Sequence, residues 1–225
     1  MEDINSILVP EVRLVGRTVF VDGEDFKDQG NLTDLIAYCA RVSNPENQQK
    51  AENNSRLIEY LIRNRHWSPF EMVHLVFEIV TTREVSRQIL RHRSFSFQEF
   101  SQRYSSPCVE CRYQSKKNRQ GSDETIPVDE EFEKKWMFYQ GSVSNFAVHC
   151  YEWAVDNGIA KEVARKVLPE GLTVTKMYMA GSLRSYIHYV QLRCSEDTQK
   201  EHREVAKKIR KIIEEDLNFH FFSFC

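Results

Sequence analysis

The sequence lacks the features that would place the protein in a membrane, outside the cell or on a nucleic acid. No apolar run is long enough to span a bilayer, and the first residues, Met1-Glu2-Asp3-Ile4-Asn5, carry acids where a secretory signal has a basic region. The 31 basic and 33 acidic side chains leave a net charge of −2, so no overall positive field would attract a polyanion. We therefore expect a cytoplasmic protein that has neither a membrane nor a nucleic acid as partner.

The chain also lacks a cysteine pattern that would indicate disulfides or a metal. Its six cysteines are scattered through 225 residues, a length that can form a core without covalent links. Only Cys108 and Cys111 have the spacing of a redox or metal pair, and no second pair completes a zinc site. We expect reduced thiols and no bound metal.

Internal repeats, low-complexity segments and Gly/Ser linkers are absent as well. Because 41% of the residues are apolar and 12% are aromatic, a chain of this length can fill one substantial core. The most loop-like stretch, residues 105–127, is expected to connect two halves of one domain. The sequence therefore predicts one domain over residues 1–225.

Hydrophobic periodicity indicates both strands and helices. Residues 7–21 are rich in β-branched side chains, residues 71–80 alternate with period two, and residues 172–179 alternate weakly, all of which favour strands. Helical spacing and capping residues predict helices at 32–41, 55–64, from Thr81 or Thr82 to about 91, 182–193, and from 195 onward. The fold class is α/β or α+β with helices predominating.

A longer helix is expected at 128–157, because its apolar residues recur at alternating steps of four and three. These residues are Phe132, Trp136, Tyr139, Val143, Phe146, Cys150 and Trp153. Asn157-Gly158 supplies the stop signal of this amphipathic helix.

Arginines gather in one part of a chain that is otherwise nearly neutral. The six are Arg83, Arg87, Arg91, Arg93, Arg103 and Arg112. Guanidinium groups interleaved with serines suit the phosphates of a nucleotide, since they form paired hydrogen bonds with phosphate oxygens. For the arginines alone, an exposed charged helix end is the simpler interpretation.

The order of residues favours the anion site. The run from Arg91 to Tyr104 contains Arg-His-Arg, then Ser101 after seven residues, then Arg103-Tyr104, and it resembles the signature of flavin-dependent thymidylate synthases. The segments 66–71, 163–169 and 182–193 are similar to three further motifs of that family, in the same order. The resemblance covers roughly residues 35 to 205, and it departs from the family pattern at Trp67, Gln98 and Gln102.

This resemblance implies a helix-rich single domain with a central, mostly antiparallel sheet flanked by helices. It implies the reductive methylation of dUMP to dTMP, with FAD as cofactor and with NADPH and 5,10-methylenetetrahydrofolate as co-substrates. It also implies a homotetramer whose sites lie between subunits. The flavin would carry the difficult chemistry, and the protein would supply positioning and electrostatics.

The resemblance assigns roles to individual positions. The residues that would contact FAD are His66, Ser68, Arg91, His92, Arg93, Glu99, Ser182, Leu183, Arg184 and His188. Those that would hold dUMP are Gln88, Arg91, Glu99, Phe100, Ser101, Gln102, Arg103, Arg165 and Arg193. Arg193 would be catalytic, because it would stabilise negative charge that develops on the uracil ring. Taken singly, each position also fits an ordinary role as a core histidine, a helix cap or a surface arginine.

A protein nucleophile is not expected. No cysteine lies within a matched motif, and Ser101 has no adjacent general base in the sequence. Two alternatives remain: a single-stranded RNA-binding module that uses the arginines and aromatics of 83–112, against which the net charge argues, and a flavoenzyme that acts on another pyrimidine nucleotide. A yellow purified protein would separate both flavoenzyme readings from the RNA-binding one.

Overall fold

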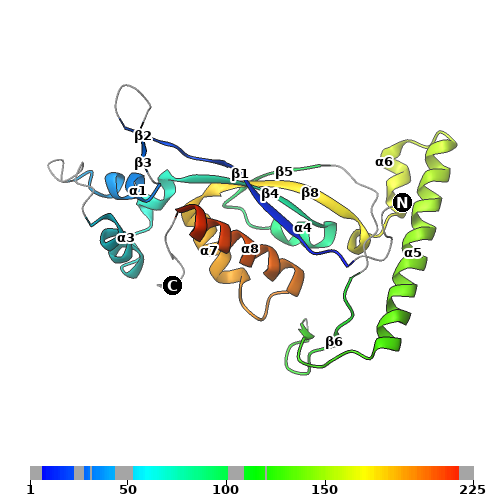
Figure 1. Ribbon diagram of the computed structural model, residues 1–225. Helices are drawn as coiled ribbons and strands as arrows, with labels where there is room; N and C mark the ends of the chain where they lie inside the picture. Colours follow the sequence, from blue (N-terminus) through cyan, green and yellow to red (C-terminus); the bar gives the residue numbers. More distant parts are fainter. Residues whose placement is uncertain are drawn as a thin grey trace.

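The computed structural model describes residues 7–22, 28–30, 32–43, 53–100, 109–119 and 121–217. A sheet lies in the middle of an elongated molecule, with helices α1 (Leu32–Ala40) and α3 (Asn54–Arg63) beyond one end of it. Helices α5 (Glu130–Asp156) and α6 (Lys161–Ala164) lie at the other end (Figure 1). No helix in the described part of the chain is long and apolar enough to cross a membrane.

The central sheet has four strands, and every neighbouring pair is antiparallel, which confirms the expected sheet. Its order is β1 (Glu11–Arg17), β4 (His74–Thr82), β8 (Val174–Ser182) and β5 (Ser96–Glu99). Two short ribbons stand apart from it: β2 (Phe20–Asp22) with β3 (Asp28–Gly30), and β6 (Tyr113–Gln114) with β7 (Ser122–Asp123). The β-branched stretch 7–21 thus contains two strands rather than one.

Helices α4 (Arg83–Ile89), α7 (Leu183–Arg193) and α8 (Lys200–Leu217) lie on one face of the sheet (Figure 1). The other elements in the described residues are the 3-10 helices η1 (Ser68–Met72), η2 (Arg165–Val167) and η3 (Glu170–Leu172). The helices expected at 32–41, 55–64 and 182–193 are confirmed, and the last helix begins five residues later than its predicted start.

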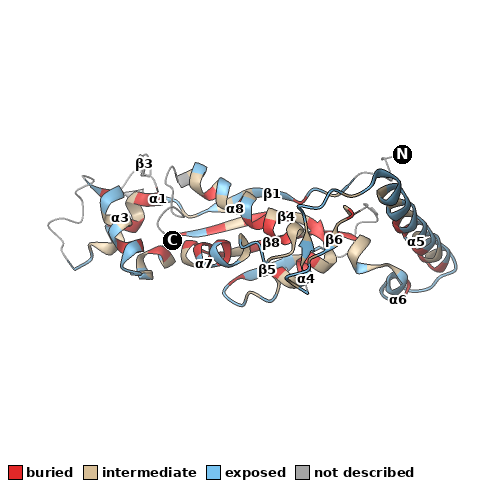
Figure 2. Cartoon of the chain, turned by 90° about the horizontal axis from the view of Figure 1, so that it is seen from below, coloured by how far each residue is buried: buried red, intermediate tan, exposed pale blue. Residues whose placement is uncertain are grey.

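The core forms where β4 and β8 turn their apolar side chains toward these helices. Leu75, Phe77 and Ile79 alternate inward on β4, as the period-two pattern predicts, and they pack with residues of α7 and α8. Figure 2 shows buried residues along β4, β8 and α7, whereas most of α5 is exposed. The core therefore holds α4, α7 and α8 against the sheet and leaves α5 outside.

Two details differ from the sequence-based expectation. Thr82 occupies the N-cap position of α4, but its side chain makes no capping hydrogen bond. On α5 the apolar stripe faces outward: Phe146 is 69% exposed and Trp153 is 58% exposed, whereas Ala147 and Tyr151 are buried. Periodicity correctly predicted the helix but did not reveal which of its faces the chain itself covers.

Strand β5, which the sequence did not predict, is held to β8 by the packing of Phe95 on Gly181. A Cβ atom added to Gly181 would stand 2.4 Å from Cδ1 of Phe95. Phe95 is buried, and its ring lies 4.8 Å from the ring of Tyr186, centroid to centroid. Only glycine leaves room for this ring, so position 181 allows Phe95 to pack against β8 where its pairing with β5 begins.

Replacing Gly181 with Ala should destabilise the protein by about 1–3 kcal/mol, because the new methyl group would displace a packed aromatic ring. Gly141→Ala is the matched control: nothing lies within 4 Å of an added Cβ there, and alanine favours a helix. Chemical unfolding of both variants would test this prediction. Equal free energies of unfolding for the two variants would show that the Phe95 ring can move aside without destabilising the protein.

Candidate functional site

Strand β8 runs directly into helix α7 at Ser182 and Leu183. The buried Ser182 accepts a hydrogen bond from the backbone N–H of Ser185 at 3.3 Å, which caps the helix as the sequence predicted. The backbone N–H of Leu183 donates to the carbonyl of Val73 at 2.7 Å. These bonds fix the start of α7 beside the residue that follows η1.

An ion pair joins η1 to α7 at the same place. Nη1 of Arg184 lies 2.8 Å from Oε1 of Glu71. The Ser182 hydroxyl and then the Arg184 guanidinium hold the pKa of the Glu71 carboxyl below its usual value. One turn further along α7, the ring of His188 meets the edge of Trp67 at a centroid distance of 5.2 Å. The pKa of His188 is lowered by burial and then by Arg184.

The other two residues of this segment that were predicted to contact FAD are the sequence neighbours of Trp67. His66 and Ser68 flank Trp67 and are both exposed. Six of the predicted FAD residues therefore gather around η1 and the first half of α7. They are His66, Ser68, Ser182, Leu183, Arg184 and His188.

The Arg-His-Arg turn (residues 91–94) follows the end of α4 and lies along α7. Nε of Arg193, the last residue of α7, donates to Nε2 of His92 at 2.9 Å. Oγ of Ser185, near the start of α7, donates to the carbonyl of Ser94 at 3.3 Å. The turn thus contacts α7 near both of its ends, at residues that lie eight positions apart, about 12 Å along the helix axis.

The hydrogen bond from Arg193 defines the state of His92. The Nε–H of arginine can only donate, so Nε2 of His92 must accept and its proton lies on Nδ1. Burial, with Arg193 and Arg91 after it, lowers the pKa of His92 to about 4. At neutral pH the turn therefore carries a neutral imidazole between the exposed side chains of Arg91 and Arg93.

Glu99 and Phe100 lie at the end of β5. Oε1 of Glu99 accepts hydrogen bonds from Oγ of Ser86 at 2.7 Å and from Oγ1 of Thr175 at 2.9 Å. Phe100 is 57% exposed. The predicted dUMP residues Ser101, Gln102 and Arg103 lie outside the described residues, as does Cys108.

Gln88 reaches into a buried polar cluster that the sequence did not indicate. Its Oε1 lies 3.3 Å from Nδ1 of His202, and Nε2 of His202 lies 3.0 Å from the hydroxyl of Tyr189. The His202 side chain is fully buried, and burial, with Arg193 and His92 after it, lowers its pKa to about 3. The one available signal was a histidine on the apolar stripe of α8, which is more often a core residue than a functional one.

Other predicted members stand apart from this surface. Arg165 lies on η2, which packs against α5 and α6 rather than against α7. Arg83 and Arg87 both pair with Glu170 on η3, at 4.0 and 3.0 Å. Arg112 pairs with the carboxylates of Glu110 and Glu201.

Arg83, Arg87 and Arg112 thus have protein carboxylates as partners in this structure, and their contacts give no support for placing them in one anion site with the other arginines. Arg91 and Arg93 instead join Arg184 and Arg193 along α7, in an arrangement that suits phosphate and carbonyl oxygens. Within the described ranges, no group of three His, Cys, Asp or Glu side chains could hold a metal ion.

Comparisons with known proteins agree on one family. The sequence profile of the family described as thymidylate synthase complementing protein matches residues 28–217. A flavin-dependent thymidylate synthase of Synechocystis is 49% identical over 211 residues, covering 90% of this chain and 94% of its own. A probable flavin-dependent thymidylate synthase of Paramecium bursaria Chlorella virus 1 is 46% identical over 185 residues, covering 80% and 84%.

The fold is similar to that of a solved structure. The UMP/dUMP methylase PolB from Streptomyces cacaoi, whose crystal structure contains 5-Br dUMP, superposes with a TM-score of 0.79. The match covers 97% of this chain and 96% of that chain at 22% sequence identity, so it supports the fold alone.

The two depressed histidine pKa values predict loss of stability in mild acid. The unfolded chain takes up protons on these imidazoles near pH 6.5, whereas the folded protein resists until about pH 4 for His92 and about pH 3 for His202. The stabilisation is complete above pH 6.5 and falls as the pH drops, toward 4 for His92 and toward 3 for His202. For the fully buried His202 the loss between pH 6.5 and 5 should be on the order of 2 kcal/mol.

Unfolding free energies of the wild type and of His202→Gln, measured across this pH range, would test the prediction. The variant should show the shallower dependence, because it has one titrating group fewer. Identical slopes for the two proteins would contradict it.

Proposed function

The chain belongs to the thymidylate synthase complementing protein family, and from this premise we propose that it is a flavin-dependent thymidylate synthase that methylates dUMP to dTMP. The observation that carries the proposal is the Arg-His-Arg turn lying along α7. It brings two of the matched motifs into one surface through the Arg193–His92 and Ser185–Ser94 hydrogen bonds. Neither the RNA-binding reading nor a flavoenzyme for another pyrimidine gains support from the comparisons.

The residues around η1 and α7 fit a flavin dinucleotide, which we propose is FAD. The N-terminus of a helix and nearby arginine and serine side chains suit a pyrophosphate, and Ser182, Arg184 and Ser68 provide them. His92, with its proton on Nδ1, and the exposed His188 suit the polar edge of a planar ring. When bound, the flavin would supply the reducing equivalents for the methyl group.

The other end of α7 fits the nucleotide. We propose that Gln88, Arg91, Glu99, Phe100 and Arg193 contact dUMP, together with Ser101, Gln102 and Arg103 of the family signature and Arg165. NADPH and 5,10-methylenetetrahydrofolate are proposed as co-substrates on the family resemblance. The cytoplasmic location stays a prediction.

Arg193 has the geometry of a positioned oxyanion donor. Its Nε–H is engaged by His92, which fixes the plane of the guanidinium group. The contact with a uracil oxygen would therefore come from its two Nη groups. A preorganised donor of this kind stabilises charge that develops on the ring without having to reorient during the reaction.

We propose further that four chains assemble through α5. Its outward apolar stripe continues into a hollow of about 550 Å³ between α5, α6 and η2, which is lined by Phe146, Trp153, Val163 and Val167 among others. An exposed apolar surface of this kind is expected at a subunit interface. Arg165 lies beside it on η2, so a second chain could complete the nucleotide site from this side.

One domain over residues 1–225 is likewise a proposal. It is supported by the main apolar core, which includes side chains from Leu32 near its beginning to Ile213 near its end. The α5 and α6 pair has only a small cluster of its own, around Tyr151 and Ala164. This pair reads as an extension of the domain rather than as a second one.

Replacing Arg193 with Ala should leave the flavin content normal and lower turnover about a hundred- to a thousand-fold. Arg193→Lys should restore little, because an ammonium group cannot both donate to His92 and reproduce the planar fork. Flavin absorbance and tritium release from uracil-labelled dUMP, with methylenetetrahydrofolate and NADPH, measure the two quantities. A colourless wild type without tritium release would overturn the proposed function. Near-normal turnover of Arg193→Ala would overturn only the catalytic role of Arg193.

Replacing Phe146 with Glu should break the proposed assembly, because a charge would be buried in an apolar contact. Val42→Glu is the matched control, with 68% exposure beyond the other end of the sheet. Light scattering should give four times the chain mass of 26.6 kDa for the wild type and the control, and a smaller particle for Phe146→Glu. A tetramer in all three proteins would place the interface elsewhere.

A further inference from the structure

A chain of hydrogen bonds connects two carboxylates to Gln88 of α4 through Gln199, the residue before α8, and runs on into the buried side chains of His202 and Tyr189. Nε2 of Gln199 donates to Oε1 of Glu84 at 2.6 Å and to Oε2 of Glu201 at 3.0 Å. Nε2 of Gln88 donates to Oε1 of Gln199 at 2.7 Å. The chain continues from Gln88 to His202 and Tyr189, and no motif of the sequence had singled out Gln199 or His202.

The carboxylates determine the direction of every bond in this chain. Because a carboxylate only accepts, the group of Gln199 that faces Glu84 and Glu201 must be its NH2. The carbonyl of Gln199 is then turned toward Gln88, and it accepts from Nε2 of Gln88. The carbonyl of Gln88 is turned in consequence toward His202, so that Nδ1 of His202 must carry the proton and donate.

The bond at the far side of His202 agrees with this direction. With the proton on Nδ1, Nε2 accepts from the hydroxyl of Tyr189 at 3.0 Å. Burial keeps the imidazole neutral and raises the pKa of the Tyr189 hydroxyl, so the hydroxyl retains its proton to donate. Each of the six members, Glu84, Glu201, Gln199, Gln88, His202 and Tyr189, therefore has its required donor or acceptor.

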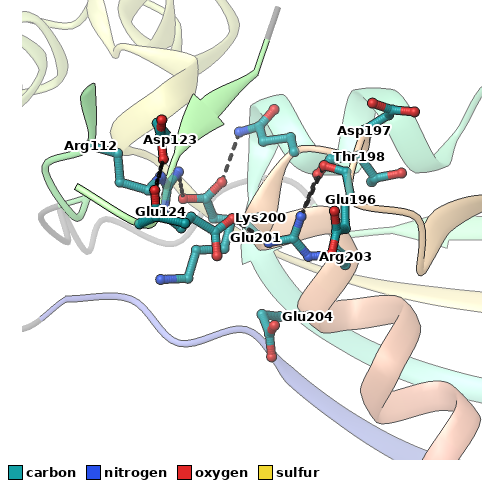
Figure 3. A network of polar contacts seen from close by, with 12 residues as sticks. Arg112, Asp123, Glu124, Glu196, Asp197, Thr198, Lys200, Glu201, Arg203 and Glu204 are labelled. Atoms are coloured by element: carbon teal, nitrogen blue, oxygen red, sulfur yellow. Dashed lines mark hydrogen bonds and ion pairs between the residues drawn. The ribbon is translucent and has the colours of Figure 1, made fainter. Parts of the chain in front are cut away.

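The carboxylate end of the chain is itself anchored by cations. Glu201 accepts a hydrogen bond from Arg112 (Figure 3). Lys200 beside it pairs with Glu110. Nη1 of Arg203, one turn further on, donates to the carbonyls of Glu196 and Thr198, each at 3.2 Å. These contacts hold the segment before α8 and keep Glu201 in place as the fixed acceptor.

We propose that His202 is a positioning residue for the substrate: by donating to Oε1 of Gln88 it holds the Gln88 amide in one orientation, and so decides which donor and which acceptor Gln88 presents to the pyrimidine nucleotide. A flipped amide would set NH2 against the Nδ1–H of His202 and oxygen against the oxygen of Gln199. Both contacts would be repulsive. This inference rests on the proposed function, which supplies the nucleotide that Gln88 would contact.

The same cluster borders the proposed catalytic arginine. The ring of Tyr189 lies 4.9 Å from the ring of His92, centroid to centroid, and His92 accepts from Arg193. The two proposed dUMP contacts at this end, Gln88 and Arg193, are thus held from behind by adjoining buried groups. His202 is in contact with one of them and close to the other.

Two substitutions at position 202 separate positioning from packing. In His202→Asn the amide nitrogen can take the place of Nδ1 and donate to Gln88, whereas the contact with Tyr189 is lost. In His202→Gln the amide of the longer side chain reaches the position of Nε2 and keeps the hydrogen bond with the Tyr189 hydroxyl. The donor to Gln88 is lost in this variant. Both variants leave a similar defect in the core, so a purely structural role would affect them alike.

The expected result is a rise in the KM for dUMP of about three- to tenfold in His202→Gln, with kcat and flavin content changed much less, since one hydrogen bond is lost at the binding site. His202→Asn should stay within about twofold of the wild type in KM, because the donor to Gln88 is kept. Equal KM values for the two variants in an active enzyme would overturn the inference.

A measurement on the unmodified protein covers the case in which a variant fails to fold. Nitrogen NMR of the wild type should show the His202 ring with a protonated Nδ1 and an unprotonated Nε2 at neutral pH. The opposite tautomer would overturn the inference, whatever the activity. A wild type that shows the expected tautomer but does not methylate dUMP would overturn the proposed function. The nucleotide contact assigned to Gln88 would then fall as well, whereas the orientation of Gln88 by His202 would stand.

Discussion

The antiparallel pairing of β4 with β8 determines where every other part of the site can lie. The register runs from His74 opposite Ser182 to Thr82 opposite Val174, so the C-terminal ends of the two strands lie at opposite ends of the strand pair. Helix α4 follows Thr82 and helix α7 follows Ser182, and both fold back over the same apolar face. Two helices that start at opposite ends of this strand pair and fold back over one face approach each other at their C-terminal ends. For this reason Arg193, which ends α7, meets His92, which follows α4.

The sequence predicted the elements whose apolar side chains the chain buries by itself. Strand β4 was recognisable because Leu75, Phe77 and Ile79 alternate against a single buried face, and α7 because Ser182 caps it. Strand β5 was not recognisable, because four residues at the edge of a sheet have no pattern of their own. Its position depends on β8, and in particular on the absence of a side chain at Gly181.

For the candidate site, the sequence indicated two segments that lie together but not the contacts that they make. The family motifs identified the Arg-His-Arg turn and α7, which do lie together. The motifs could not show that Glu170, some eighty residues away in sequence, engages Arg83 and Arg87. Nor could they reveal His202, since a histidine on a buried helical stripe has the same pattern whether it fills the core or orients a neighbour. Charge density in a sequence indicates cations, and only the fold decides which of them face protein carboxylates.

The outward apolar stripe of α5 also links the folding of one chain to the presence of others. The core under the central sheet is complete within a single chain, whereas α5 and α6 share only a small cluster. If the stripe is covered in an assembly, mass action stabilises this arm in proportion to the logarithm of protein concentration. Dilution would then loosen α5 before it disturbs the sheet, and Arg165 on the neighbouring η2 would lose its fixed position along with it. Protein concentration would thus act on the proposed nucleotide site as an allosteric effector would.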